Sequence, residues 1–286
     1  MIEVKNLTFK YGKQHADTIK GLNFSIRKGE IYGFLGPSGA GKSTTQKILT
    51  KLLTGYNGNA LIMGQELNRW DNRFYNHIGV GFELPNHYAK LTGLENLKLF
   101  ASMYDRPSMN LTALMERVGL QEAAGKKTET YSKGMKMRLN FIRALVHNPD
   151  ILFFDEPTSG LDPVNARNLK DYILELKEQG KTIFLTTHNM HDADELCDRV
   201  AFITDGQIMV EDAPGELKLK FGKPWLKVEY MDEQVRSADF CLQDIGQNPE
   251  FLNLLRTHPI VSMHTCEASL DEVFIKTTGQ SLNIPD

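Results

Sequence analysis

A glycine-rich segment near the N-terminus, GPSGAGKST, occupies residues 36–44. Its spacing is G-x-x-x-x-G-K-[ST], and it lies between a predicted strand and a predicted helix, the context that this phosphate-binding motif requires. Glycines let backbone N–H groups turn toward phosphate oxygens at a helix N-terminus, where negative charge is favoured. We expect Lys42 to reach the β- and γ-phosphates and Ser43 to bind Mg²⁺. A plain glycine-rich turn with a surface lysine is the alternative. The predicted phosphate-binding residues are Gly36, Pro37, Ser38, Gly39, Ala40, Gly41, Lys42, Ser43 and Thr44.

Two acids close an apolar run in the segment ILFFDEPTSGLD, residues 151–162. Such a run is typical of a buried parallel strand, which delivers the residues that follow it to the carboxyl edge of the sheet. We expect Asp155 to lie on the Mg²⁺ side of a bound phosphate and Glu156 to lie where it could polarise a water for attack on the γ-phosphate. The alternative is that both acids only solvate the end of the strand.

His188 follows a second apolar run, KTIFLTT, and should stand at the same edge. A neutral or protonated imidazole there could contact the γ-phosphate. Taken alone, this residue is more simply interpreted as a surface histidine that caps a helix. A metal site is a third interpretation, although zinc sites show more distinct spacing. The neighbouring residues that such a site would use are His191, Asp192, Asp194 and Glu195.

The elements that must position these residues alternate between strands and helices. Period-two patterns at residues 2–9, 22–26 and 31–35 predict strands that lead into the glycine-rich loop, and the middle third of the chain has helical periodicity. This alternation favours an α/β fold with a parallel sheet. After Gly222 the pattern weakens, so we predict domains at residues 1–222 and 223–286.

Local signals predict where several of these elements begin and end. Thr92 and Glu95 form a capping box for a helix, and Asp162 with Pro163 has the features of an N-cap followed by a first helical residue. An Asp-Gly pair between two apolar runs predicts a hairpin turn. The remaining signals are a helix over residues 41–53, that hairpin turn at Asp205 and Gly206, and a capped last helix from Ser269 to Gly279.

Composition is ordinary for a soluble globular protein, with 41% hydrophobic residues, 24% charged residues and a formal net charge of −3. No strong electrostatic partner is implied for the chain as a whole. From Pro224 to the end, ten Asp and Glu stand against four Lys and Arg. This acidic region should therefore avoid nucleic acid and anionic lipid.

The cysteine count and the hydropathy of the chain indicate in which cellular compartment the protein works. Cys197, Cys241 and Cys266 are an odd number of widely spaced residues, which disfavours a disulfide or zinc framework and favours a reducing cytoplasm. The chain begins in a strand pattern without a basic-then-apolar leader, and no apolar run approaches the roughly 18 residues that span a bilayer. We expect the protein to reach a membrane only by docking on a partner.

The segment YSKGM, residues 131–135, places a serine and a glycine at the start of a predicted helix, some 90 positions after Lys42. With the segments above, it resembles the ATP-binding subunits of ABC transporters over about residues 1–220. It lies where that family has its Leu-Ser-Gly-Gly-Gln signature, and residues 136–162 continue the family pattern. The resemblance implies ATP and Mg²⁺ as cofactors. It also implies a P-loop NTPase core with an N-terminal antiparallel β subdomain and a helical subdomain at about residues 85–147. Beyond the resemblance, a strand pattern at residues 224–230 and the capped last helix predict a small C-terminal α+β appendage.

The same resemblance implies roles for individual residues. Ser132 and Gly134 would bind the γ-phosphate of ATP held by a second subunit, which explains why they lie far from the phosphate-binding loop in the sequence. Glu156 would be the general base and His188 the switch histidine. Asp162 would belong to the loop that touches across the dimer.

Four further positions match the family pattern or depart from it. Tyr11 matches the family's adenine-stacking aromatic, although it could be one more strand aromatic. Glu83 stands where the family usually has glutamine, and it could hold Mg²⁺ more strongly or serve the coupling loop without touching metal. Lys133 replaces the first glycine of the signature and would add positive charge near phosphate or point to solvent; Met135 replaces its glutamine. Hydrolysis is still predicted. The predicted metal ligands are Ser43, Glu83 and Asp155.

The function implied by the resemblance is ATP hydrolysis that powers transport through separate transmembrane permease subunits, by ATP-driven closure of a dimer. We expect a homodimer ahead of a heterodimer. It would be cytoplasmic and held at the inner face of the cell membrane by subunits that meet residues 83–97. The tail segment ASLDEVFIKTTG, residues 268–279, resembles ATPases that serve exporters of drugs, peptide antibiotics or polysaccharides. Export is therefore expected ahead of import.

Two other functions remain open. A soluble ABC-type ATPase acting on ribosomes or DNA is disfavoured, because the chain has one ATP module and no sustained heptads between the two motifs. A weakly hydrolysing regulatory module would follow if Glu83 or Lys133 spoiled the site. Basic residues could also form a nucleic-acid patch, but aromatic interleaving is poor and such runs usually form a solvated face. These basic residues are Lys126, Lys127, Lys133, Lys136, Arg138 and Arg143.

Overall fold

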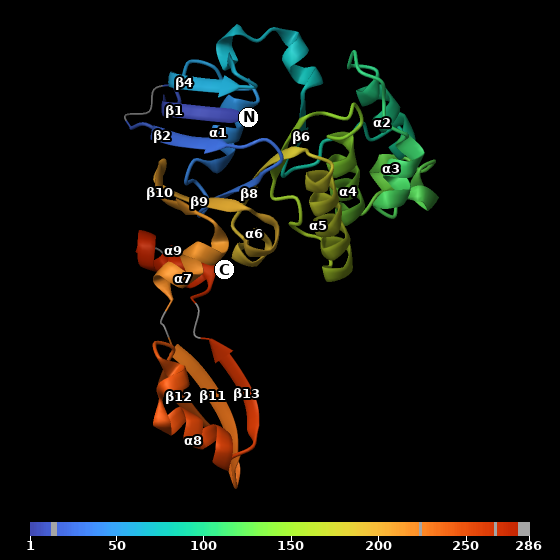
Figure 1. Ribbon diagram of the computed structural model, residues 1–286. Helices are drawn as coiled ribbons and strands as arrows, with labels where there is room; N and C mark the ends of the chain where they lie inside the picture. Colours follow the sequence, from blue (N-terminus) through green and yellow to red (C-terminus); the bar gives the residue numbers. More distant parts are fainter. Residues whose placement is uncertain (13–15, 223–224, 266–267, 280–286) are drawn as a thin grey trace. The chain divides into compact units, whose positions relative to one another are not determined.

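The computed structural model describes residues 1–12, 16–222, 225–265 and 268–279 (Figure 1). The chain forms two compact units, Met1–Asp212 and Ala213–Asp286. The domain boundary at residue 222 stays a prediction; that residue directly follows α7 (Pro214–Phe221), which belongs to the second unit. None of the helices in the described ranges combines the length and apolar character that a bilayer crossing demands.

The first unit contains two sheets. One is antiparallel with the strand order β2-β1-β4-β5, and the other has the order β10-β9-β3-β8-β7-β6. In the six-stranded sheet all neighbours are parallel except β10 and β9. The predicted α/β fold with a mostly parallel sheet is confirmed. The strands are β1 (Ile2–Phe9), β2 (Ile19–Ile26), β3 (Ile31–Leu35), β4 (Asn57–Ile62), β5 (Gln65–Glu66), β6 (Ile78–Gly81), β7 (Ile151–Asp155), β8 (Thr182–Thr187), β9 (Arg199–Thr204) and β10 (Gln207–Asp212).

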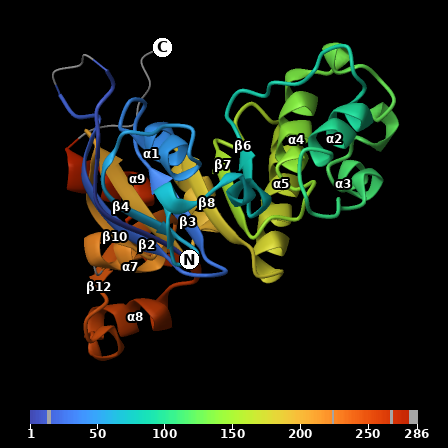
Figure 2. The same cartoon turned by 90° about the horizontal axis from the view of Figure 1, so that it is seen from above.

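Three helices of the first unit form a group, and α5 runs beside α4 of that group (Figures 1 and 2). A helical group made of α2, α3 and α4 lies away from the antiparallel sheet, within the range predicted for a helical subdomain. The helices α1, α5 and α6 each follow one strand of the parallel sheet. The helices are α1 (Lys42–Leu49), α2 (Gly93–Ala101), α3 (Leu111–Arg117), α4 (Lys133–Arg143), α5 (Pro163–Glu178) and α6 (Met190–Leu196), with short turns η1 (Leu67–Arg69), η2 (Asn72–Asn76), η3 (Gln121–Ala123) and η4 (Thr128–Thr130).

The main core of this unit lies between the two sheets and around α1. In β1 the buried and exposed residues alternate in part, as expected for a strand with one covered face, whereas every residue of β3, β7 and β8 is buried. Phe24, Tyr32, Phe34 and Phe184 pack together with ring centroids 5.5–6.3 Å apart. This aromatic packing makes the central strands a rigid base for the loops that follow them.

Most local signals are confirmed. Thr92 and Glu95 form both bonds of a capping box at α2. Asp162 caps α5 with proline in its first turn, and the Asp205–Gly206 turn has φ values of 48° and 77°. These positive values match a hairpin turn whose twist suits the flanking strands.

The end predicted for the first helix is wrong. The expected helix over residues 41–53 ends at Leu49. Lys51 adopts a φ of 60°, and the backbone N–H groups of Leu52 and Leu53 both donate to the Lys47 carbonyl. The helix is therefore closed by a left-handed residue that has a side chain, where sequence reasoning looks for glycine.

The second unit has α+β structure, as predicted. A three-stranded antiparallel sheet, β12-β11-β13, packs with α8 around Val228, Phe240 and Phe251. The helix α9 begins at its predicted cap Ser269 and packs against α7. Cys266 lies outside the described residues. The further elements are β11 (Trp225–Asp232), β12 (Gln234–Cys241), η5 (Ile245–Gln247), α8 (Pro249–Thr257), β13 (Ile260–Thr265) and α9 (Leu270–Thr278).

Candidate functional site

Four strands end at the same edge of the six-stranded sheet. Leu35 at the end of β3 pairs with Thr187 at the end of β8, and Asp155 at the end of β7 pairs with Thr186. The edge strand β6 ends at Gly81, which pairs with the residue before Asp155. Loops that follow the carboxyl ends of parallel strands form the usual ligand site of an α/β sheet. All the predicted site residues that follow these strands therefore lie along one edge.

The phosphate-binding loop is held close to β9. A Cβ atom on Gly36 would lie 2.1 Å from the carbonyl oxygen of Ile203, so only glycine fits at this position. Gly41, which precedes α1, has a φ of 110° and provides no side-chain cap for the helix. The first N–H groups of α1 are thus not capped by a side chain and face the loop, the arrangement that binds phosphate at helix N-termini.

Lys42 is the buried cation of this loop. Its Nζ atom donates to two carbonyl oxygens of the loop itself, at 2.6 and 3.1 Å. Burial lowers the pKa of Lys42, while the charges of Glu156, Asp155 and Glu83 act in the opposite direction. The structure thus brings the predicted base and two predicted metal ligands within electrostatic reach of Lys42. Phosphate oxygens could replace the loop carbonyls as acceptors for this ammonium group.

Glu156 and His188 form a direct pair. The Oε1 atom of Glu156 accepts from the backbone N–H of His188 at 2.9 Å and lies 2.7 Å from its Nδ1 atom. The carboxylate assigns the proton to Nδ1, which leaves Nε2 as the second ring nitrogen available for a ligand. Glu156 has a φ of 50°, a left-handed conformation that costs about 1–3 kcal/mol and persists only where surrounding contacts enforce it.

Two threonines that sequence reasoning missed hold the acids in place. Thr187 donates to Oε2 of Glu156 at 3.0 Å, and the Thr186 hydroxyl donates to Asp155. Both threonines are buried at the end of β8. The available signal was the pair of threonines that ends the otherwise apolar run KTIFLTTH, since hydroxyls buried at a strand end need partners.

Tyr11 lies beside the first turn of α1. Its hydroxyl is 3.3 Å from Oγ1 of Thr44, and its ring packs edge-on against Phe9 with centroids 4.9 Å apart. Thr44 is buried and Ser43 is half-buried. These contacts place Tyr11 next to the phosphate-binding loop, while its stacking on adenine stays a prediction.

The YSKGM segment forms a second location. Ser132 caps α4 by accepting from the backbone N–H of Met135 at 3.2 Å. The side chain of Lys133 lies against Gly160, where an added Cβ would meet its Cε atom at 3.1 Å. A Cβ atom added to Gly134 would likewise lie 3.5 Å from the Cδ2 atom of Leu161. The signature and the loop at residues 158–162 thus contact each other within one chain.

Ser132 and Gly134 have no direct polar contact with the first location in the described part of the chain. Among the hydrogen bonds and ion pairs of the described residues, none joins Ser132 or Gly134 to Lys42, Glu156 or His188. Asp162 caps α5, and the side chain and backbone N–H of Asn165 lower the pKa of its carboxyl group. The assembly of these two locations into one site shared by two chains stays a prediction.

The metal interpretation of the residues after His188 is not favoured. Asp192 accepts from Thr158 and pairs with Lys170, and Glu195 also pairs with Lys170. Throughout the described part of the chain, no group of three His, Cys, Asp or Glu residues is arranged to hold a metal ion. The set of Ser43, Glu83 and Asp155 stays a prediction.

The segment after β6 is tied to α4 by three side chain to backbone contacts. Asn140 donates to the Phe82 carbonyl at 2.7 Å, Arg143 donates to the Asn86 carbonyl at 2.5 Å, and Nε2 of His87 lies 2.9 Å from the Lys136 carbonyl. Burial lowers the pKa of His87 to about 4.

Arg138 likewise donates to a backbone carbonyl, at 2.6 Å. Two of the arginines that the disfavoured nucleic-acid patch would use are therefore engaged within the protein.

Comparison with known proteins decides the family. The ABC transporter profile matches residues 19–159, and a profile described as the fluoroquinolone efflux ABC transporter C-terminal domain matches residues 225–267. A fluoroquinolones export ATP-binding protein of Mycobacterium tuberculosis is 49% identical over 284 residues, which cover 99% of this chain and 94% of the relative. The chain belongs to the ABC transporter family. Another relative of this ABC protein, the daunorubicin/doxorubicin resistance ATP-binding protein DrrA of Streptomyces peucetius, is 33% identical over 97% of this chain and 92% of its own length.

Solved structures agree with this assignment. A dimeric ATP-binding cassette in a post-hydrolysis state bound to ADP and Pi is similar with a TM-score of 0.69 and 28% identity, covering 74% of this chain and 98% of that chain. An ATP-binding subunit of an ABC transporter has a TM-score of 0.70 and 27% identity, covering 77% and 93%. The fold, ATP binding and ATPase activity predicted from the sequence are confirmed.

Proposed function

We propose that this ABC ATPase works as a dimer that powers export of drug-like compounds through separate membrane subunits. Among the described residues, no hydrogen bond joins the signature residues Ser132 and Gly134 to the Glu156–His188 pair, which supports a dimer in which a second copy completes the site. The identity to a fluoroquinolones export protein along nearly the whole chain supports export. The match of residues 225–267 to an efflux-type profile supports the same direction.

The oxygen donors at the carboxyl edge fit a Mg²⁺ ion. Ser43 and Asp155 offer a hydroxyl and a carboxylate, the hard ligands that Mg²⁺ takes in phosphate sites. Glu83 is exposed and its charge acts on Lys42, which supports its proposed role as a further oxygen donor. When bound, Mg²⁺ would neutralise phosphate charge during transfer. The protein's part is to orient these oxygens beside Lys42.

Glu156 acts as the general base in this proposal. Its carboxylate already accepts from the Thr187 hydroxyl and from the backbone N–H and Nδ1 of His188, which fixes its orientation. A carboxylate offers about four acceptor sites, so one remains for a water molecule. His188 has Nε2 on the opposite edge of the ring from Nδ1, and in the protonated imidazole this Nε2–H can donate to a phosphate oxygen. The pair thus both receives the proton of the water and senses the phosphate.

The complement to each site comes from α4 of a second copy. The first turn of α4 contains no acid, and Lys133 adds a positive charge there. A helix N-terminus of this kind favours an anion. ATP held between the Lys42 region of one copy and the Ser132 region of the other would bind the closed dimer more tightly than the open one. Hydrolysis would remove that preference and allow opening.

A groove on the helical side of the first unit is the proposed contact for the membrane subunit, at the cytoplasmic face of the cell membrane. It has a volume of about 550 Å³ and is lined in part by Leu84, Phe100 and Tyr104. Leu84 is 77% exposed, which is unusual for a large apolar side chain. Arg143 lines the groove and belongs to α4. Movement of a docked segment would therefore reach the signature helix directly.

The first experiment tests the dimer. The Glu156→Gln variant should bind ATP and hydrolyse it slowly, so its molar mass in solution is measured with and without Mg-ATP. We expect ATP to double the mass, and we expect the added change Ser132→Arg to abolish the doubling while ATP binding is kept. A mass that stays monomeric with ATP bound would refute a homodimer of the isolated chain.

A second experiment tests export. The membrane protein that co-purifies with this chain in mild detergent is identified and co-expressed with it. Cells that carry both proteins should accumulate less of a fluorescent fluoroquinolone than cells in which the ATPase is the Glu156→Gln variant. Equal accumulation would contradict export of this compound class, while leaving the ATPase assignment intact.

A further inference from the structure

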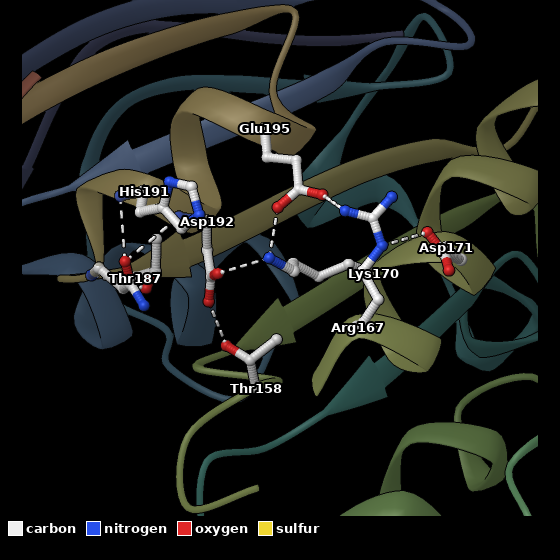
Figure 3. A network of polar contacts seen from close by, with 9 residues as sticks. Thr158, Arg167, Lys170, Asp171, Thr187, His191, Asp192 and Glu195 are labelled. Carbon is white, nitrogen blue, oxygen red and sulfur yellow. Dashed lines mark hydrogen bonds and ion pairs between the residues drawn. The ribbon is translucent and has the colours of Figure 1, made fainter. Parts of the chain in front are cut away.

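A polar network behind the site connects three elements (Figure 3). Thr158 lies in the loop between Glu156 and Asp162, Lys170 lies on α5, and Asp192 lies on α6 just after His188. The loop and α6 follow neighbouring parallel strands, β7 and β8. The network therefore spans the two chain segments that leave the Glu156–His188 pair.

Asp192 is the centre of this network. Its Oδ2 atom accepts from Oγ1 of Thr158 at 2.6 Å, and its Oδ1 atom lies 3.3 Å from Nζ of Lys170 (Figure 3). Lys170 also contacts Glu195, which in turn pairs with Arg167 at 2.5 Å. Each oxygen of Asp192 thus has its own partner, one from the loop and one from α5.

The inner part of the network is removed from solvent. Lys170 is 8% exposed and Asp192 is 6% exposed. Burial opposes the positive charge of Lys170, but the hydrogen bond to Glu195 and the charge of Asp192 outweigh it and raise the pKa of Lys170. The ammonium group of Lys170 is thus charged near neutral pH. Buried charged hydrogen bonds have defined geometry, so Asp192 has little freedom to move.

Because Asp192 is fixed in position, its hydrogen bond to Thr158 restrains the loop that follows Glu156. Glu156 has a left-handed φ, which its neighbours must enforce. A turn links the Ser159 N–H to the Glu156 carbonyl at 3.1 Å, and the Leu161 N–H donates to the Thr158 carbonyl at 3.2 Å. The hydroxyl of Thr158 is the point at which this turn is fixed to α6. The carboxylate of Glu156 bonds instead to Thr187 and His188, which precede α6.

We propose that Thr158 and Asp192, with Lys170 as counter-ion, are positioning residues for hydrolysis that keep Glu156 aligned with His188. They do not touch the reacting atoms and act through the conformation of the 156–162 loop. The inference rests on the proposed role of Glu156 as the base. Because the same loop ends at Asp162, the network also sets where the dimer contact lies relative to the base.

The test compares two changes at one position. Thr158→Val keeps the shape of the side chain and removes the hydroxyl, while Thr158→Ser keeps the hydroxyl. We expect Thr158→Val to lower kcat for ATP about tenfold with KM within twofold of wild type, because positioning affects the transition state more than ground-state binding. Thr158→Ser should stay within about twofold of wild-type kcat. If the effect came only from a general loss of packing, kcat would not fall for Thr158→Val and stay near wild type for Thr158→Ser.

A double-mutant cycle addresses the partner. If the hydroxyl acts only through Asp192, the variant that combines Thr158→Val with Asp192→Ala should lose no more kcat than the more severe single variant. Arg167→Gln is the matched control, since its ion pairs belong to the same network but its side chain is 61% exposed. It should keep wild-type kcat. Thermal unfolding of each variant confirms that activity is measured on folded protein.

Three results would overturn the inference. They are a wild-type kcat for Thr158→Val, a change confined to KM, and additive losses in the cycle. The Glu156→Gln variant distinguishes failure of the positioning role of Thr158 from failure of the proposed role of Glu156 as the base. If Glu156→Gln hydrolyses ATP at the wild-type rate, the proposed role of Glu156 fails; if it is inactive while Thr158→Val is fully active, only the positioning role fails.

Discussion

The substitution Gly36→Ala should displace the phosphate-binding loop by an amount that the structure defines. The new Cβ atom would lie 2.1 Å from the Ile203 carbonyl oxygen and 3.1 Å from its Cγ2 atom. Ile203 is fully buried in the six-stranded sheet, so the loop must yield by about 1 Å, since interiors are close-packed. Overpacking of this kind costs about 1–3 kcal/mol of folding free energy. A shift of about 1 Å in positioned groups can also cost on the order of 100-fold in rate.

Two assays separate these effects. ATP affinity is measured in the Glu156→Gln background, where hydrolysis does not interfere, and thermal unfolding is measured in the same variants. We expect Gly36→Ala to weaken ATP binding at least about tenfold and to lower Tm by about 2–4 °C for each kcal/mol lost. Gly125→Ala is the matched control, because no atom lies within 4 Å of its added Cβ. If both variants bind ATP equally, the close approach of Ile203 does not shape the loop.

Three further predictions concern other parts of the chain. Tyr11→Phe should keep ATP affinity and Tyr11→Ala should weaken it about fivefold in nucleotide titration if the ring stacks on adenine; equal affinities would leave only the contact with Thr44. Burial lowers the pKa of His147, which contacts the Ile78 carbonyl, to about 4 from an ordinary value near 6.5. Between these two pH values the imidazole is protonated in the unfolded chain but not in the folded protein, so the free energy of unfolding should fall as pH drops from about 6.5 to about 4. His147→Gln should reduce this dependence of the unfolding free energy on pH, measured by urea unfolding, by up to about 1.4 kcal/mol per pH unit. Burial raises the pKa of the Cys197 thiol, so this thiol should resist a thiol reagent at pH 8 until the protein is unfolded, as mass spectrometry of peptides can show.

Features formed by residues close in the sequence were predicted well. The capping box of Thr92 and Glu95, the cap at Asp162 and the turn at Asp205 and Gly206 depend on groups within three positions of each other. The end of α1 was not predicted, because Lys51 takes a conformation for which its residue type gives no signal. Local chemistry determines structure where the partners are neighbours and the residue type restricts the backbone.

The sequence by itself determined the chemistry of this ABC ATPase: a glycine-rich loop with Lys42, two acids after a buried strand, and a signature far from the loop. The tertiary structure decided how these groups are held. Thr186 and Thr187 meet Asp155 and Glu156 only because β8 lies beside β7, and Thr158 meets Asp192 for the same reason. These partners are about 30 positions apart in the chain. Their contacts follow from strand order, which no short sequence pattern specifies, because long-range pairing depends on the packing of the whole sheet.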